Sequence, residues 1–345
     1  MQKLLSAALV ALMLVAGLYA QDDDEAAAAA TPTRALGTVT ATSIACKSGG
    51  LSGGVCTQLL VTCPGVPNVY GYIKTNTPAN PKGTVIWGTG TQGNGLYDNI
   101  FTYGKTAVTN VYNAGFRTVQ MSWGTPFNSS QPGGWVEGPG GVLAAACRWA
   151  TVANYIYTKV QNNNAKPMCA TANSGGAGAL AYALSQYGSN KIISMAEVTS
   201  GPPTARLDWG CVCKEGKLNT FCGKGSLGTC FGKTDGAIWD PAYTPNAYCS
   251  EATQGTQPPN INAAYFLADS VEASGANYNF PHTYVNVVFG GTDTSSAIPI
   301  GLDWYNKITS KKEQTCISDA PHSIPNVLDG ATTIANDLIG LCKLQ

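Results

Sequence analysis

Short apolar segments typical of buried strands alternate with longer segments of helical spacing between residues 83 and 341. The expected strands are 83–87, 117–123, 167–172, 192–198, 284–289 and 316–317. The expected helices are 97–114, 143–160, 175–187 and 324–341. This alternation predicts an α/β fold, in which a mostly parallel sheet carries helices on both faces. Before it, the β-rich segments 58–62 and 68–74 flank a Cys-Pro-Gly-Val-Pro turn and predict an antiparallel hairpin.

The stretch 202–281 breaks this alternation. It holds five cysteines, many glycines and few long apolar runs, so we expect an irregular insertion held by disulfides. An insertion at this point would lie over the carboxyl ends of the strands, where ligands bind in open α/β sheets. The insertion is therefore a possible lid or substrate wall, and a loop without such a role is the alternative. Residues 37–345 fit one domain carrying this insertion better than two equal domains.

The first 36 residues are not expected to join this domain. Residues 1–20 contain one lysine, then an apolar run, and end on Ala20, a pattern typical of a secretory signal peptide. Residues 21–36 have four consecutive acidic residues, an alanine run and no aromatic residue, which predicts a disordered leader or a propeptide. The sequence thus predicts a secreted, extracellular protein.

Cysteine usage agrees with an oxidising compartment. The chain has 12 cysteines, an even number without a Cys-x-x-Cys pair, and we expect them to form disulfides with none left over. The alternative is a metal site formed by Cys211, Cys213, Cys222 and Cys230. Asn128-Ser129-Ser130 is a sequon for glycosylation, which fits the same compartment.

Charge is balanced and sparse. The chain has 20 basic and 20 acidic residues, and charged residues make up only 12% of it. This gives no basic stripe, which argues against binding of nucleic acid or of anionic lipid. After residue 20, no apolar run approaches the roughly 18 residues that predict a membrane span. The sequence does not predict an oligomeric state.

Ala172-Asn173-Ser174-Gly175-Gly176 joins an expected strand to an expected helix. Here the sequence resembles the nucleophile elbow of the α/β-hydrolase superfamily, with alanine in place of the first glycine of Gly-x-Ser-x-Gly. Small neighbours let strand and helix pack closely around a serine on a strained turn. The resemblance, which extends to secreted fungal proteins of this fold, implies an α/β-hydrolase with Ser174 as nucleophile. The alternative is that Ser174 only caps a helix.

Gly50-Leu51-Ser52-Gly53-Gly54 matches the same motif letter for letter. It lies between Cys46 and Cys56, before the expected sheet, and neither follows a strand nor opens a helix. Because the motif needs its strand–turn–helix context, Ser52 is not expected to be a nucleophile.

A nucleophilic serine needs a base, and the chain has two histidines. The resemblance places the base on a loop after the last strand. His322 fits, because it follows the short strand 316–317 and precedes the last helix, whereas His282 would lie at the wrong end of the strand 284–289. We therefore predict that His322 is the base.

The third residue of such a site is a carboxylate that orients and stabilises the imidazole. Asp293 follows the strand 284–289 through Gly290-Gly291-Thr292, and the chain order Ser174, Asp293, His322 is the order of the superfamily. Asp208, which comes after the preceding strand, is the alternative acid. Asp319 is expected only to cap a loop.

The resemblance also implies an oxyanion hole made of two backbone N–H groups. Gly175 would supply one. Thr89 would supply the other, because Trp87-Gly88-Thr89-Gly90 resembles the His-Gly-x-Gly run of the superfamily; the alternative is that these glycines only form a turn. The spacing Gly88-x-Gly90-x-x-Gly93 lacks the acidic residue of a nucleotide-binding fold about 20 positions on. We expect no cofactor and no metal.

Together these features predict a serine hydrolase that works through an acyl-enzyme. A carboxylic ester hydrolase, like a carboxylesterase or lipase, is favoured, with a small-molecule or polymer-borne ester as substrate. Its activity should rise through about pH 6 to 7, because the base must be neutral. The alternatives are a non-catalytic extracellular binding module on a hydrolase fold and a secreted serine peptidase.

Overall fold

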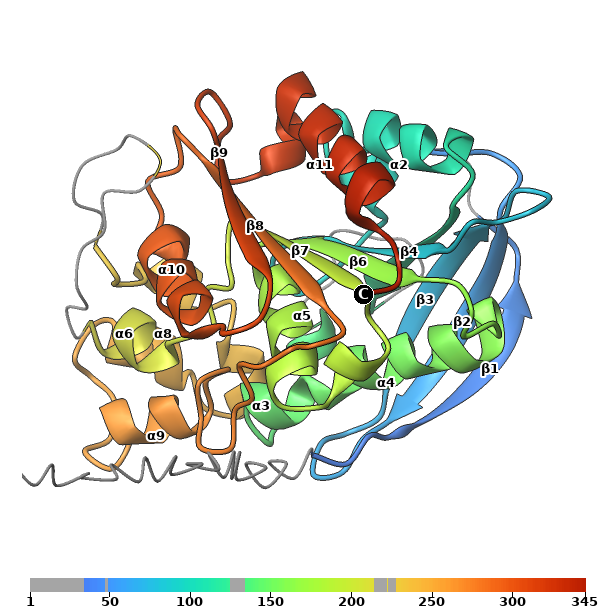
Figure 1. Ribbon diagram of the computed structural model, residues 1–345. Coiled ribbons are helices and arrows are strands. Elements are labelled where there is room, and N and C mark those ends of the chain that lie inside the picture. Colours follow the sequence, from blue (N-terminus) through green and yellow to red (C-terminus); the bar gives the residue numbers. More distant parts are fainter. Residues whose placement is uncertain (1–33, 47–48, 125–133, 214–221, 223–227) are drawn as a thin grey trace, which may run out of the picture. The chain divides into compact units, whose positions relative to one another are not determined.

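The computed structural model describes residues 34–46, 49–124, 134–213, 222 and 228–345 (Figure 1). In this part of the chain one sheet has the strand order β1-β2-β3-β5-β4-β6-β7-β8-β9. The strands are β1 (Thr38–Ile44), β2 (Val55–Thr62), β3 (Val69–Asn76), β4 (Thr84–Gly88), β5 (Arg117–Trp123), β6 (Met168–Asn173), β7 (Met195–Thr199), β8 (Tyr284–Gly290) and β9 (Lys312–Ile317). The pairs from β1 to β3 and β3 with β5 are antiparallel, and all other pairs are parallel. The predicted entry hairpin is β2–β3.

Helices cover both faces of the sheet. The main ones are α1 (Tyr97–Ile100), α2 (Gly104–Asn113), α3 (Val142–Ala145), α4 (Cys147–Tyr155), α5 (Gly175–Ser185), α10 (Ala297–Lys307) and α11 (Leu328–Leu341). Figure 1 shows α2 and α11 on one face, and α3, α4 and α5 on the other. The predicted α/β fold class, a mostly parallel sheet with helices on both faces, is confirmed.

The central strands are buried along their whole length because helices cover both faces of the sheet. Every residue of β4 and of β6 is buried. Val85 and Trp87 of β4 belong to the core between the sheet and α2 and α11, whereas Ile86 belongs to the core on the other face. A strand between two helical layers therefore has a mostly apolar sequence without polar residues at every second position, which is the signal that predicted it.

Three expected helices are interrupted, and in the segment 324–341 the extended Val327 separates the 3-10 turn Ile324–Asn326 from α11. The segment 97–114 forms α1 and α2, with Phe101, Thr102 and Tyr103 between them. At Gly104 the chain passes so close to α1 that a Cβ would lie 2.2 Å from the carbonyl oxygen of Tyr97. The segment 143–160 forms α3 and α4 and ends in the π-helical turn Ile156–Gln161. Helical spacing alone does not reveal such breaks.

The strand β1 was not predicted. Most of its residues are exposed, so its sequence carries no apolar run, and it is held as an edge strand by pairing with β2. Just before it, the Arg34 amide donates to the carbonyl of Gln186 at 2.9 Å, and Arg34 Nε donates to Gln186 Oε1 at 3.3 Å.

The insertion 202–281 consists of short helices without a strand in its described residues. They are α6 (Leu207–Val212), α7 (Lys233–Gly236), α8 (Tyr248–Ala252) and α9 (Ala263–Ala268), with the 3-10 turn η5 (Asp240–Tyr243). No helix in the described part of the chain is long and apolar enough to cross a membrane.

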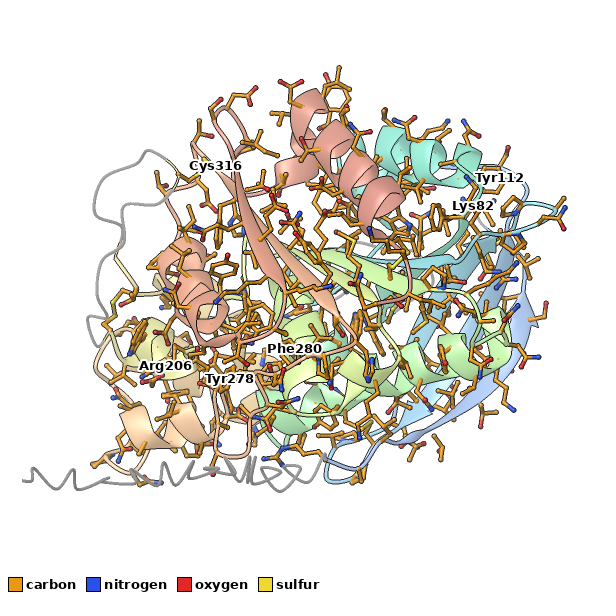
Figure 2. All side chains as sticks on the ribbon, in the orientation of Figure 1. Lys82, Tyr112, Arg206, Tyr278, Phe280 and Cys316 are labelled. Carbon is orange, nitrogen blue, oxygen red and sulfur yellow. A yellow bond between two sulfur atoms is a disulfide. The ribbon has the colours of Figure 1, made fainter. Side chains whose placement is uncertain are left out.

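All 12 cysteines are paired, so the prediction of disulfides with no cysteine left over is confirmed. The pairs are Cys46–Cys56, Cys63–Cys147, Cys169–Cys342, Cys211–Cys249, Cys213–Cys230 and Cys222–Cys316. The four cysteines considered as metal ligands are among them. Cys222–Cys316 fastens the insertion to β9, where Figure 2 labels Cys316.

A buried acidic residue, Glu197, lies on β7 beneath α11. Its carboxylate accepts hydrogen bonds from Thr171 Oγ1 at 3.2 Å and from Asn286 Nδ2 at 3.4 Å. The same amide donates to Asp337 Oδ2 of α11 at 2.9 Å. Burial first, and then the charge of Asp337, raise the pKa of Glu197 well above its ordinary value. Burial first, and then the charge of Glu197, raise the pKa of Tyr97 on α1.

Glu197→Gln is expected to stabilise the protein at pH 8 by roughly 1 kcal/mol, because glutamine keeps the shape and neutrality of the protonated acid. A carboxyl whose pKa is higher in the folded than in the unfolded state supports folding below its unfolded pKa and loses this contribution as pH rises. The glutamine side chain of the variant does not titrate, so its contribution to folding does not change with pH. Thermal midpoints of the wild-type protein and the variant at pH 4 and pH 8 test this. The difference between the two midpoints should shift in favour of the variant from pH 4 to pH 8, and the same difference at both pH values would contradict the prediction.

Candidate active site

Ser174 occupies a strained turn between β6 and α5. Its φ is 53° and its ψ is −119°, a region that residues with a Cβ rarely adopt. The turn is held because the Ser174 amide donates to the Thr199 carbonyl of β7 at 2.8 Å, and the Gly178 amide donates to the Ser174 carbonyl at 3.0 Å. The local sequence thus forms the sharp strand-to-helix turn that the motif predicted.

The small residues around Ser174 are required by the loop that follows β4. A Cβ on Gly175 would lie 1.8 Å from the carbonyl oxygen of Thr91, and one on Gly176 would lie 2.2 Å from that of Thr89. Ala172 occupies the first glycine position of the motif. Its methyl group faces Gly88 and Gly176, whose added Cβ atoms would lie 3.0 and 3.4 Å from it, so alanine fits because both neighbours are glycine.

The loop with His322 packs against the turn that carries Asp293. The Gly291 amide donates to the Ile317 carbonyl at 2.7 Å, and the Thr292 amide donates to the Ala320 carbonyl at 3.0 Å. A Cβ on Gly291 would lie 2.4 Å from the carbonyl oxygen of Ser318. The two glycines before Asp293 therefore allow the loops after β8 and β9 to approach closely.

The structure brings Ser174, Asp293 and His322 together into one hydrogen-bonded chain. His322 Nε2 lies 2.8 Å from Ser174 Oγ, and His322 Nδ1 lies 2.9 Å from Asp293 Oδ2. The imidazole side chain is 37% exposed, whereas that of Asp293 is 1% exposed. A water-accessible histidine between a hydroxyl and a buried carboxylate can accept the hydroxyl proton.

Asp293 is held as a carboxylate by its neighbours. Its burial raises the pKa, but the hydrogen bond and charge of His322, together with hydrogen bonds from Ser295, outweigh burial and keep the pKa of Asp293 below its ordinary value. The Ser295 amide donates to Asp293 Oδ1 at 2.8 Å. The carboxylate is thus charged and fixed in orientation.

Ser295 is a residue of this site that the sequence analysis missed. Its Oγ lies 3.1 Å from His322 Nδ1, and it also accepts from the Ala297 amide at 3.3 Å at the start of α10. The signal that could have found it is the Asp-x-Ser spacing of Asp293 and Ser295, because an aspartate readily accepts from the amide two residues on.

The predicted oxyanion donors differ in their placement. Gly175 is the first residue of α5, so its N–H has no partner within the helix and lies directly after Ser174. Thr89 is buried, and its hydroxyl donates to the carbonyls of Asn94 and Gly95 at 3.2 and 3.4 Å. Thr91, two residues further along the same loop, lines the cavity at Ser174, and Thr89 does not.

A cavity of about 260 Å³ opens at Ser174 and His322. Its other lining residues are Thr91, Pro203, Phe231, Asp235, Ile238, Trp239, Ser295, Ser296 and Ala297. Residues 203 to 239 belong to the insertion, which therefore forms one wall of the cavity. The wall is mostly apolar and aromatic, and Asp235 adds one carboxylate.

The rejected serine and histidine lie elsewhere. Ser52 is exposed in the turn between β1 and β2, where its carbonyl accepts from Asn76 Nδ2 at 2.7 Å. Asp98 of α1 holds this turn by accepting from the Leu51 amide at 2.8 Å. His282 is exposed before the amino end of β8, whereas Asp293 follows the carboxyl end of that strand.

Asp208, the alternative acid, belongs to an ion-pair cluster on the insertion. Arg206 donates to both of its carboxylate oxygens, at 2.8 and 2.6 Å, and also lies 3.6 Å from Asp303 of α10. Figure 2 labels Arg206 in this region. Asp319 is exposed. Of the three acids considered, only Asp293 contacts His322.

Some predictions fall on residues that the structure does not describe. The signal peptide at 1–20, most of the leader at 21–36 and the sequon at Asn128 lie outside the described residues. Within the described ranges, no group of three or more His, Cys, Asp and Glu side chains is placed to hold a metal ion.

No protein-family model and no curated protein matches the chain. Solved structures similar to it include esterases and hydrolases. Est1E from Butyrivibrio proteoclasticus is 12% identical, with a TM-score of 0.47, over 82% of this chain and 97% of that one. Acetyl xylan esterase 1 from Thermoanaerobacterium sp. JW/SL YS485 is 15% identical, with a TM-score of 0.48, over 87% of each chain. A dienelactone hydrolase from Anabaena variabilis ATCC 29413 is 10% identical, with a TM-score of 0.44, over 90% of this chain and 100% of that one.

Proposed function

We propose that the protein is a secreted serine hydrolase that cleaves carboxylic esters. The observation that carries this proposal is the hydrogen-bonded chain from Ser174 Oγ through His322 to Asp293 Oδ2 at the mouth of a cavity. A serine hydroxyl is a weak nucleophile until a neighbouring base accepts its proton, and this arrangement supplies that base.

In the first step, Ser174 Oγ attacks the ester carbonyl carbon as its proton passes to His322 Nε2. The carbonyl oxygen becomes an oxyanion, and the imidazolium is stabilised by Asp293, which stays ionised. His322 then returns the proton to the alkoxide as the alcohol leaves, and an acyl-enzyme remains. Water, activated by the same imidazole, releases the acid and restores the hydroxyl.

The oxyanion needs two donors. We assign one to the Gly175 N–H at the start of α5, where the helix dipole also favours negative charge. We move the second from the N–H of Thr89 to that of Thr91, because Thr91 lines the cavity at Ser174 and Thr89 does not. The loss of one such donor typically lowers kcat by about 10² to 10³.

Esters are favoured over peptides by the cavity wall. Phe231, Ile238 and Trp239 of the insertion present apolar surface beside Ser174, which suits an uncharged acyl or alkyl group. Secretion is supported by the six disulfides, which persist in oxidising compartments. We retain cleavage at a signal peptide and glycosylation at Asn128 as parts of the proposal.

The proposal is tested with p-nitrophenyl esters and p-nitroanilides that carry the same acyl group. We expect turnover of the esters, with a burst of p-nitrophenol that matches the enzyme concentration, because the acyl-enzyme forms before it is hydrolysed. Faster cleavage of the anilides would instead identify a peptidase. Hydrolysis of neither class would favour a binding module on a hydrolase fold.

Ser295→Ala is expected to lower kcat about tenfold with little change in KM, because one hydrogen bond that positions the Asp293–His322 pair is lost. Ser295→Thr keeps the hydroxyl and should recover most of the activity. The thermal midpoint serves as a control for the contact with Ala297. If the changes in KM and kcat run parallel to a loss of thermal midpoint, Ser295 only stabilises α10.

A further inference from the structure

A second cavity, of about 490 Å³, lies between the insertion and the loop before α3. It shares no lining residue with the cavity at Ser174. Three tyrosines, Tyr243, Tyr248 and Tyr265, and the carboxylate of Asp269 line it, and its other walls are glycine, alanine and proline. In the part of the chain that the structure describes, no lysine, arginine or histidine lines this cavity.

The three tyrosine rings form a contiguous cluster. The centroids of Tyr243 and Tyr248 are 5.9 Å apart, those of Tyr243 and Tyr265 are 6.0 Å apart, and those of Tyr248 and Tyr265 are 5.9 Å apart. The rings of Tyr248 and Tyr265 stand at 88° and so form a corner. Tyr243 is buried, whereas Tyr265 is 36% exposed, so the cluster reaches from the interior to solvent.

Asp269 adds negative charge to this cluster. It accepts from the Tyr243 hydroxyl at 2.6 Å and from the amides of Val142 and Leu143 at 2.7 and 2.9 Å. A phenol that donates to a carboxylate is polarised, which increases the electron density of its ring. Burial raises the pKa of Asp269 to about 6, so the group is ionised at pH 8.

We propose that this cavity binds a small organic cation of the alkylammonium class. The electron-rich faces of the tyrosines attract a cation whose charge is spread over methyl groups, and Asp269 contributes its charge behind Tyr243. An anion would be repelled by the carboxylate of Asp269 and by the ring faces. A neutral sugar could stack on the rings but would gain nothing from the carboxylate.

The test compares choline with 3,3-dimethylbutan-1-ol, which has the same shape but carries no charge. Each compound is titrated calorimetrically into the whole protein at pH 8. We expect saturable binding of choline that is about tenfold tighter than that of the neutral alcohol. Equal binding of the two compounds, or equal binding of glucose, would overturn the proposal because charge would then play no part.

Variants locate the site. Tyr265→Phe keeps the aromatic face and should bind choline as wild type does, whereas Tyr265→Leu should weaken binding about fivefold. Tyr103→Leu removes a tyrosine of equal exposure, before α2, and is the matched control. Ser174→Ala should leave choline affinity unchanged. Loss of binding in Ser174→Ala, or unchanged binding in Tyr265→Leu, would place the ligand elsewhere and overturn the assignment.

Discussion

Ser174→Ala should lower kcat for ester hydrolysis by about 10⁵ to 10⁶, to a level set by the oxyanion donors and the cavity alone. The reason is that His322 then has no hydroxyl within 2.8 Å to activate, and water has to attack the ester directly. The burst of product should also disappear, because no acyl-enzyme can form. Stopped-flow measurement with a p-nitrophenyl ester reports both effects.

Ser52→Ala is the matched control, since it removes the serine of the other Gly-x-Ser-x-Gly sequence. Ser52 is exposed, and the polar contact that the structure records for it involves its main-chain carbonyl, which alanine keeps. Turnover and burst should equal those of wild type. A wild-type rate in Ser174→Ala, or a large loss in Ser52→Ala, would contradict the choice of nucleophile.

Asp293→Asn should lower kcat by roughly 10⁴ while the fold is retained. The amide has nearly the same volume, but it carries no charge to stabilise the imidazolium. It also favours the tautomer of His322 in which Nε2 carries the proton and cannot accept that of Ser174. Because Asp293 is only 1% exposed, water cannot replace the carboxylate.

Asp208→Asn distinguishes the two acids. Asp208 accepts from two of the three guanidinium nitrogens of Arg206, so its replacement should reduce the thermal midpoint and leave kcat near the wild-type value. A fall of kcat in Asp208→Asn comparable with that in Asp293→Asn would require a different acid for His322.

Much of the sheet could be predicted from the sequence because its central strands are buried on both faces. β4, β6 and β7 consist entirely of buried residues, as strands of a parallel sheet covered on both faces do. The edge strand β1 lacks this signal, since pairing with β2 rather than burial holds it. The break before Gly104 depends on contact with the carbonyl of Tyr97, which spacing along the chain does not encode.

The candidate site was predictable where residue type and local order decide the outcome. The chain has only two histidines, so the base had to be one of these two residues. Gly290 and Gly291 allow the close approach that brings Asp293 to the loop of His322. Ser295 was missed because its contact with His322 crosses from one loop to another. The pairing of Asp208 with Arg206 was equally invisible, since an acid near the end of a strand does not reveal its partner.

The central claim is that Ser174 is a nucleophile activated by His322, and covalent labelling tests it most directly. The wild-type protein is treated with a fluorophosphonate, digested and mapped by mass spectrometry, beside His322→Ala. We predict one phosphonylated residue, Ser174, and a rate of labelling that falls by at least about 10³ without the imidazole. A label on any other residue, or equal labelling of both proteins, would contradict the account.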